Sequence, residues 1–312
     1  MPELKHLPVL LKETIDGLNI KNGGVYFDGT LGGGGHSYEI LKKSAPDGLL
    51  IATDLDDYAI ARASDKLKEF DGRYTLIKDN FKNFKKIQRE RNITGFDGIL
   101  LDLGVSSFQL DDKSRGFSYM AESEKLDMRM SSENPLTAEY IVNNYSEKDL
   151  IRILKEYGEE RFAVGIAKGV VSARKIKPIS TVGELNGIIE KAIPPKFKHD
   201  GHPSKRTYQA LRIEVNGELE GITETIKDMV GGLKRKGRIA IITFHSLEDR
   251  IVKTVFKDLE TDCVCDKSLP VCVCGKKKEI EIITKHPIIA GENELSVNGR
   301  ARSAKLRIAE KI

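Results

Sequence analysis

The chain has 312 residues and a mass of 34.8 kDa, the length of two ordinary domains or of one domain with a large insertion. Apolar residues make up 39% and charged residues 31%, which excludes collagen, low-complexity disorder and a disulfide miniprotein. No apolar stretch approaches the roughly 20 residues that span a bilayer, and the first residues hold no apolar signal segment, so we expect a cytoplasmic protein without membrane association.

The first hundred residues alternate predicted strands and helices. The strands are short apolar runs that end in Asp or Asn, at Val25–Phe27, Leu49–Ala52, Leu76–Ile77 and Ile99–Leu103. Helical patterns lie between them, at His36–Ser44, Asp57–Phe70 and Phe81–Arg91. Strands separated by helices predict an α/β fold with a parallel sheet. The carboxyl ends of such strands share one edge of the sheet, where open α/β sheets bind ligands.

After Ser107 the pattern changes to successive helices. Capping signals, apolar spacing or both predict helices at Leu150–Tyr157, Arg161–Ala173, Leu185–Ile193 and Thr207–Glu220. Strand character returns only at Arg238–Ser246 and near Ala304–Ala309. The pattern therefore predicts a discontinuous sheet domain, residues 1–107 and 214–312, that is interrupted by an all-helical insertion, residues 108–213.

The insertion carries a local excess of positive charge. Between Arg174 and Arg212 there are nine Lys or Arg residues against three acidic residues, whereas the net charge of the whole chain is only +4. This excess indicates a polyanionic partner, with a solvated basic face as the alternative. Arg206 and Arg212 are the candidates for contacts with such a partner.

A glycine-rich turn follows the first strand, between Asp28 and His36. Asp54 ends the second strand, 20 residues after Gly34, where a carboxylate would accept hydrogen bonds from ribose hydroxyls. Asp28 would repel a pyrophosphate but suits the ammonium group of a methionine moiety, and Phe81 is placed to flank an adenine. These features favour S-adenosylmethionine over NAD as the cofactor. The alternative is a turn that serves only tight packing.

Asp102 and His245 are the catalytic candidates. Asp102 ends the fourth strand, and an exocyclic amine that accepts a methyl group needs a hydrogen-bond acceptor to orient it, because its lone pair is delocalised into the ring. Binding of the cofactor and capping of a helix are the alternatives for Asp102. His245 ends the returning strand at the same sheet edge, with a satisfied core histidine as the alternative.

All four cysteines lie in one lysine-rich segment, as Cys263-Val-Cys265 and Cys272-Val-Cys274. In a cytosolic protein this pattern favours a tetrathiolate zinc site over disulfides. The spacing differs from the Cys-x₂-Cys of common zinc knuckles, so reduced thiols stay an alternative. Methyl transfer from a sulfonium needs no Lewis acid, and we assign no metal ligand to the active site.

Nine segments in order along the chain match one known family. They are HLPVLLKE (His6–Glu13), FDGTLGGGGHS (Phe27–Ser37), GILLDLGVSSFQLDD (Gly98–Asp112), RGFSY (Arg115–Tyr119), LDMRM (Leu126–Met130), YGEERFA (Tyr157–Ala163), TYQALRIEVNGELE (Thr207–Glu220), FHSLEDRIVK (Phe244–Lys253) and RARSAKLRIAE (Arg300–Glu310). Together they closely resemble the bacterial 16S ribosomal RNA cytosine-N4 methyltransferases.

The resemblance implies methyl transfer from S-adenosylmethionine to the exocyclic N4 of a cytidine in the decoding centre of the small ribosomal subunit. It implies a class I (Rossmann-like) methyltransferase sheet with an inserted helical domain that helps to hold RNA. The implied cofactor contacts are Gly34, Gly35 and His36 in the loop, Asp54 at the ribose, Phe81 at the adenine, and Asp102 and Gln109 at the methionine end. The oligomeric state stays open, with a homodimer as one alternative.

Two other classes of function are compatible with parts of the pattern. The first is a ribosome-associated RNA-binding protein whose glycine loop has lost its cofactor; the presence of Asp28, Asp54 and Asp102 disfavours it. The second is a nucleotide-dependent oxidoreductase, which Asp28 and the absence of a Gly-x-Gly directly after the strand disfavour.

Overall fold

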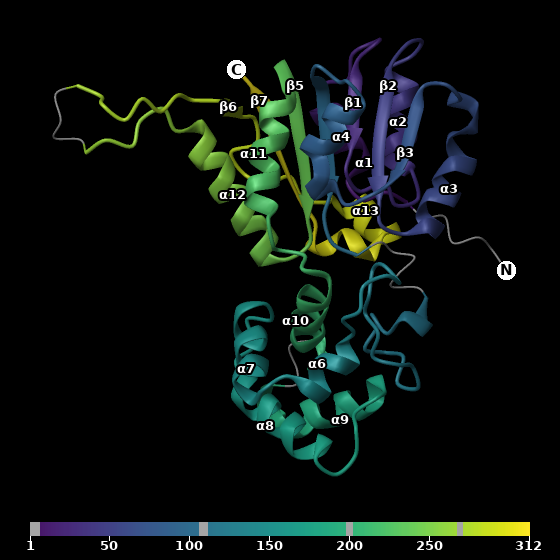
Figure 1. Ribbon diagram of the computed structural model, residues 1–312, viewed down its shortest axis with the longest axis vertical. Helices are drawn as coiled ribbons and strands as arrows, with labels where there is room; N and C mark the ends of the chain where they lie inside the picture. The colour runs from purple at the N-terminus through teal and green to yellow at the C-terminus, as the bar shows by residue number, and fades with distance from the viewer. Residues whose placement is uncertain (1–6, 106–111, 198–201, 267–270) are drawn as a thin grey trace. The chain divides into compact units, whose positions relative to one another are not determined.

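A computed structural model of the chain describes residues 7–105, 112–197, 202–266 and 271–312 (Figure 1). The chain divides into two compact units, a sheet unit of residues 1–104 and 221–312 and a helical unit of residues 105–220. Sequence patterns place the second boundary at 213/214, inside α10 (Lys205–Asn216), whereas α10 stays in the helical unit to its end because Val215 is buried in the core of that unit. Within the described residues no helix is long and apolar enough to cross a membrane.

The sheet unit is built on a mixed sheet of seven strands in the spatial order β3-β2-β1-β4-β5-β7-β6. Strands β1 to β5 are parallel to one another, and β7 is antiparallel to both β5 and β6. The strands are β1 (Val25–Asp28), β2 (Leu49–Asp54), β3 (Tyr74–Lys78), β4 (Phe96–Asp102), β5 (Leu233–Thr243), β6 (Ile280–Ile282) and β7 (Lys305–Lys311). The predicted α/β fold is confirmed.

Helices cover both faces of the sheet because successive side chains of a strand point to opposite faces. In β1, Tyr26 packs into the core that holds Ile40 of α2, while Phe27 makes edge-on ring contacts with Phe84 of α4 and with Phe96. One group of helices that contact each other is α1 (Leu11–Gly17), α2 (Gly35–Lys43) and α3 (Asp57–Leu67). The other group is α4 (Phe84–Glu90), α11 (Ile222–Gly232) and α12 (Ser246–Glu260), and α13 (Glu292–Val297) precedes β7.

Strand order explains where a ligand binds in this sheet. The chain runs from β1 outward to β2 and β3 and then returns to place β4 on the other side of β1. This reversal makes the carboxyl ends of β1 and β4 a topological switch point, the usual ligand position in open α/β sheets. The strands β1 and β4 end there at Asp28 and Asp102, and β2, beside β1, ends at Asp54.

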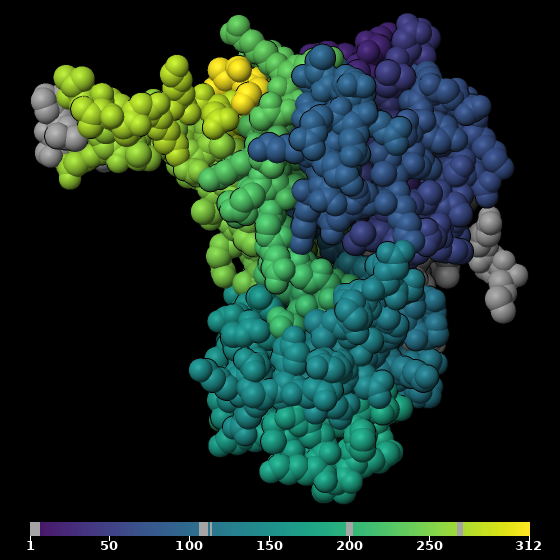
Figure 2. Space-filling view, viewed as in Figure 1, coloured from purple at the N-terminus to yellow at the C-terminus, as the bar shows by residue number. Residues whose placement is uncertain are grey.

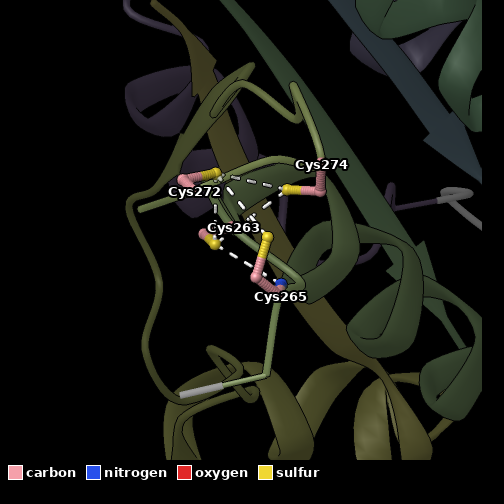
Figure 3. Close-up of side chains that lie close together, drawn as sticks. All are labelled: Cys263, Cys265, Cys272 and Cys274. Atoms are coloured by element: carbon pink, nitrogen blue, oxygen red, sulfur yellow. Dashed lines mark hydrogen bonds between the residues drawn. The ribbon is translucent and has the colours of Figure 1, made fainter. Parts of the chain in front are cut away.

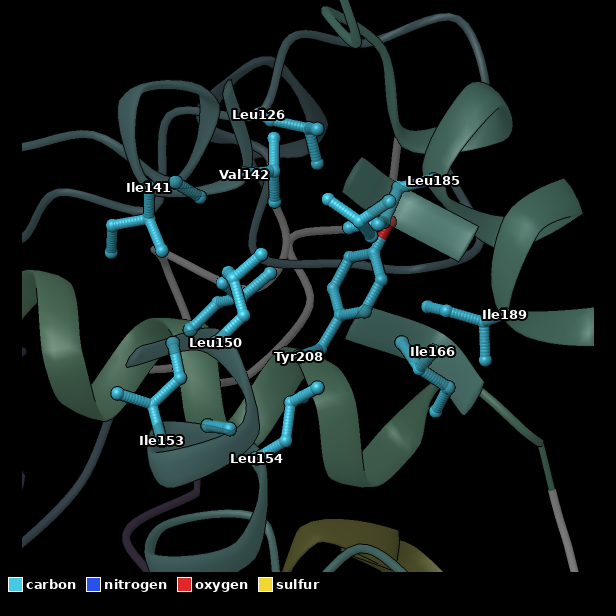
Figure 4. Packing of buried hydrophobic residues seen from close by; sticks show 14 of the residues in the cluster. Leu126, Ile141, Val142, Leu150, Ile153, Leu154, Ile166, Leu185, Ile189 and Tyr208 are labelled. Carbon is cyan, nitrogen blue, oxygen red and sulfur yellow. The ribbon is translucent and has the colours of Figure 1, made fainter. Parts of the chain in front are cut away.

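The helical unit packs its helices around an apolar core of its own (Figure 4). Its helices are α6 (Ala138–Asn144), α7 (Glu147–Glu156), α8 (Ala163–Arg174), α9 (Val182–Ala192) and α10. Both predicted capping signals are present: the Ser146 side chain accepts a hydrogen bond from the Asp149 amide, and Thr181 forms a capping box with Glu184. Leu150, Ile166 and Tyr208 are among the buried residues that join the helices.

Candidate functional site

The glycine-rich turn between β1 and α2 is a tight loop that needs glycine at specific positions. Gly34 has φ 71° and precedes the first residue of α2, and a Cβ there would lie 3.0 Å from the Cβ of Ala63 on α3. A Cβ on Gly35 would lie 2.2 Å from the Cγ of Pro8. The loop therefore accommodates its neighbours only with glycine at these two positions.

Asp28, at the end of β1, joins this loop to α2 through hydrogen bonds. The carboxyl group is 1% exposed, and its oxygens accept hydrogen bonds from the Thr30 amide (3.1 Å) and the Ser37 hydroxyl (2.7 Å). Burial raises the pKa of Asp28 to about 6, although these two hydrogen bonds lower it. The sequence suggests that Asp28 faces an ammonium group. In the structure both of its oxygens already have partners, one from Thr30 of the loop and one from Ser37 of α2. A cofactor contact by Asp28 stays a prediction.

Asp54 holds the other side of the loop from the end of β2. Its Oδ2 accepts a hydrogen bond from the Gly32 amide (2.8 Å), and its Oδ1 accepts one from the Asp56 amide (2.9 Å). Burial raises the pKa of Asp54 above its ordinary value. Each carboxylate oxygen has two lone pairs, so Asp54 retains the capacity to accept the ribose hydroxyls that the sequence predicts.

Asp102 lies at the end of β4, beside the same loop, and its amide donates a hydrogen bond to the Thr30 hydroxyl. Its Oδ1 is buried and has no hydrogen-bond partner among the described residues. Burial, followed by the negative charges of Asp28 and Glu248, raises the pKa of Asp102 well above its ordinary value. A buried acceptor without a partner is costly, which indicates a group that a ligand satisfies.

His245 occupies a different position from the one that the sequence predicts. The strand ends at Thr243 rather than at Ser246, and His245 caps α12 instead of closing β5. Its Nδ1 accepts a hydrogen bond from the Glu248 amide (3.4 Å), and its Nε2 lies 3.1 Å from Glu248 Oε1. The helix start ends the strand here because His245 and Glu248 form a capping box. A catalytic role for His245 stays a prediction.

Glu248 is a site residue that sequence reasoning missed. It is 1% exposed, its Oε2 accepts hydrogen bonds from the Phe244 and His245 amides, and its charge acts on Asp102. The available signal was the spacing of His245 and Glu248, three residues apart, which is the spacing of a capping box. Thr30 and Ser37, which hold Asp102 and Asp28, were likewise not assigned.

The remaining predicted cofactor residues are placed as follows. His36 is buried, and its Nε2 lies 3.1 Å from the carbonyl oxygen of Val9, so the ring ties the N-terminal segment to the loop. Phe81 begins a short helical turn after β3, and its Cβ would contact a Cβ on Gly29 at 2.9 Å, so it abuts the loop. Gln109 lies outside the described residues.

The acidic groups at this edge of the sheet indicate which kind of ligand can bind there. The negative charges of Asp28 and Glu248 each raise the pKa of Asp102. The charge of Asp54 likewise raises the pKa of Asp28. A cationic ligand would relieve this repulsion, whereas a pyrophosphate would increase it. The edge is therefore suited to a positively charged small molecule.

The basic segment of the helical unit divides into residues that serve the fold and residues that are exposed. Arg212, a predicted RNA contact, is held by a bidentate ion pair with Glu218, in which both N···O distances are 2.9 Å. Arg174 donates to the carbonyl oxygens of Val142 and Tyr145. The exposed members are Lys175, Lys177, Lys191, Lys196, Lys205 and Arg206, and Lys198 lies outside the described residues.

Asp28→Asn should change how stability depends on pH. The pKa of Asp28 is about 6 in the fold against 3.8 for the ordinary carboxyl, so its stabilising protonated form is fully present below about pH 4 and is lost as pH rises through about 6. Between about pH 4 and 7.5, the free energy of unfolding of wild type should fall by as much as about 3 kcal/mol relative to that of Asp28→Asn. Urea unfolding at both pH values measures this. The exposed Asp71→Asn is the control, and a pH-independent difference would contradict the assignment.

Comparison with known proteins identifies the family to which the chain belongs. The model of the MraW methylase family matches residues 3–312. The ribosomal RNA small subunit methyltransferase H of Clostridium botulinum is 55% identical over 310 residues, which cover 99% of this chain and 100% of that protein. The protein of the same name from Lachnospira eligens is 54% identical over 311 residues, which cover 99% and 98%. As the nine segments predict, the chain belongs to the MraW methylase family and is a methyltransferase.

Proposed function

We propose that this protein transfers a methyl group from S-adenosylmethionine to the exocyclic N4 of a cytidine in the decoding centre of 16S ribosomal RNA. The names of its relatives support ribosomal RNA of the small subunit as the substrate. The choice of the cytidine amine rests on the motif resemblance and on the chemistry of Asp102. The substrate would be met in the cytoplasm, where small ribosomal subunits are assembled.

The observation that carries this proposal is the buried, unpartnered Oδ1 of Asp102 among other acidic groups. A cationic cofactor next to this edge would favour the ionised form of Asp102, since an opposite charge lowers the pKa of a carboxyl group. The free oxygen can then accept a hydrogen bond from an amine N–H of the substrate. One carboxylate can thus interact with both the cationic cofactor and the amine of the substrate.

The residues of the loop fit the cofactor. S-adenosylmethionine supplies an electrophilic methyl group on a cationic sulfonium. Asp54 would hold the ribose with the lone pairs that Gly32 and Asp56 leave available, and Asp102 would face the methionine end. Gly34 lets the turn pack against Ala63 of α3, which holds the backbone of this loop in place.

Asp102 would act on the acceptor nitrogen in two ways. A hydrogen bond from the amine to Oδ1 orients the nitrogen and increases its electron density as the new N–C bond forms. The methylated nitrogen carries one proton more than the product, and that proton must leave. After the transfer no sulfonium charge remains to lower the pKa of Asp102, and burial again raises it. Asp102 then accepts a proton more readily than an exposed Asp does, which suits it to this step.

A nucleotide-dependent oxidoreductase fits this site less well. Its pyrophosphate would lie near the carboxyl groups of Asp28 and Asp102, where like charges repel. An RNA-binding protein without catalysis is a second alternative. Retention of a buried acceptor with no partner is unexplained in that case, because a protein without a ligand at this site gains nothing from it.

Asp102→Asn tests the catalytic role. The amide keeps the size of the side chain but replaces one acceptor oxygen by a donor, so the single-turnover rate should fall by about 10²–10⁴ at saturating cofactor. Binding of the cofactor should change much less, because the interaction with the amine strengthens only in the transition state. Rapid-quench assays with small-subunit RNA measure the rate. Full recovery of the rate at saturating S-adenosylmethionine would leave Asp102 a binding residue only.

Asp54→Ala tests the cofactor site. The substitution removes a charge-assisted acceptor for the ribose and should weaken S-adenosylmethionine binding by about 1–3 kcal/mol. Isothermal titration calorimetry on the free protein measures the affinity. Asp71→Ala removes an exposed carboxylate from the same unit and should leave the affinity unchanged. Equal affinities of wild type and Asp54→Ala would exclude Asp54 from the site.

A triple charge reversal tests the RNA contact of the helical unit. If the exposed Lys191, Lys196 and Lys205 contact phosphates, replacing all three by Glu should reduce the slope of log K against log salt by about 2–3. Filter binding across a salt series measures the slope. The matched control replaces the exposed Lys148, Lys155 and Lys168 of the same unit by Glu. A slope that both triple variants reduce equally, or that neither changes, would assign the basic segment to a solvated face.

A further inference from the structure

The four cysteines converge in the segment between α12 and β6 (Figure 3). Their sulfur atoms all lie within 4.8 Å of one another, and four of the pairwise distances are 3.5, 3.5, 3.8 and 3.9 Å. A disulfide bond needs about 2.05 Å between sulfur atoms, so these cysteines are free thiols or metal ligands. The two Cys-x-Cys pairs, separated along the chain, thus form one cluster.

The separations match a tetrahedral metal site. Zinc–sulfur bonds of about 2.3 Å in a tetrahedron place the sulfur atoms about 3.8 Å apart. The observed distances of 3.5–3.9 Å scatter around this value. Four thiols without a metal would have no reason to gather at this spacing, because a thiol is only a weak hydrogen-bond donor and acceptor.

Backbone amides face the sulfur atoms, as thiolates require. The Val264 amide donates to Cys274 Sγ (3.5 Å), the Val273 amide to Cys265 Sγ (3.3 Å) and the Cys265 amide to Cys263 Sγ (3.4 Å). Each of these bonds joins a sulfur to the backbone of another residue of the cluster, and together they disperse negative charge over the loop. Such outer hydrogen bonds commonly orient the ligands of a metal and tune their basicity.

The described apolar side chains of the segment do not form a core that would hold it in place. The side chains between the paired cysteines and beside them are exposed, with Val264 at 64%, Val271 at 69% and Val273 at 76%. Figure 2 shows the segment projecting from the rest of the sheet unit. Short segments without a core commonly depend on a disulfide or a metal for their structure. At the base of the loop, Lys276 forms an ion pair with Asp258 of α12.

We propose that Cys263, Cys265, Cys272 and Cys274 bind one Zn²⁺ ion as a structural tetrathiolate site. The four thiols release their protons as the metal binds, and the resulting site carries two negative charges in a segment that is rich in lysine. All four positions of the tetrahedron are occupied by protein, so the site has no open position for a substrate or a water. Its role is to fix the loop, separately from methyl transfer.

The metal content of the full chain tests this proposal. Protein purified without chelator from zinc-containing medium should hold about one zinc ion per chain by elemental analysis. Cys272→Ser and Cys274→Ser should each lower that content at least about tenfold. Val273→Ser changes an exposed residue between these two ligands and should retain the metal. Reloading wild type with Co²⁺ should produce a thiolate charge-transfer band that both Cys variants lack.

Three results would overturn the proposal. They are wild-type protein that stays free of zinc after incubation with zinc and a reductant, zinc content unchanged in the Cys variants, and iron in place of zinc, the other metal common in sulfur tetrahedra. If the Cys variants fail to fold, limited trypsin digestion of wild type replaces them. Chelator should then accelerate cleavage at the lysines 276–278 at least about tenfold, and an unchanged rate would overturn the proposal.

Discussion

Three carboxyl groups are buried away from water at one edge of the sheet, and the rest of the site depends on this constraint. Asp28, Asp54 and Asp102 end three adjacent strands, and burial raises the pKa of each. The fold tolerates Asp28 and Asp54 because loop amides and a hydroxyl donate hydrogen bonds to them. Asp102 lacks such donors at Oδ1 among the described residues. The carboxyl groups of Asp28 and Asp54 therefore stabilise the loop, whereas Asp102 keeps an oxygen that is available for a ligand.

This division of roles explains why small polar residues matter around the glycines. Thr30 accepts a hydrogen bond from the Asp102 amide, and Ser37 donates one to Asp28, so a single turn joins β1, β4 and α2. His36 extends the connection to Val9 of the N-terminal segment. The positions of Asp102 and of the glycine-rich loop are thus set by one network of hydrogen bonds.

Much of the fold and part of the site could be predicted from the sequence. The apolar runs of β1, β2 and β4 and the capping signals at Ser146 and Thr181 are local patterns, and the structure confirms them. The sequence contains two competing signals at the end of β5, the capping-box spacing of His245 and Glu248 and a strand pattern that continues through Phe244, and it does not show which one prevails. Arg212 pairs with Glu218 six residues along the chain, past the end of α10, a separation outside the i, i+4 spacing of helical ion pairs. The burial of Glu248 depends on tertiary contacts, which no local pattern reveals.

The position of the helical unit within the chain has a consequence for the order of folding. Asp102 pairs with Ile242 across β4 and β5, 140 residues further along, and β5 pairs in turn with β7 near the C-terminus. The helical unit lies wholly between these partners and contains its own core. During synthesis on a ribosome, residues 105–220 can collapse while β4 still lacks a neighbour on one side. Because β5 follows the helical unit in the chain, β4 gains its second neighbour only after residues 105–220 have been synthesised.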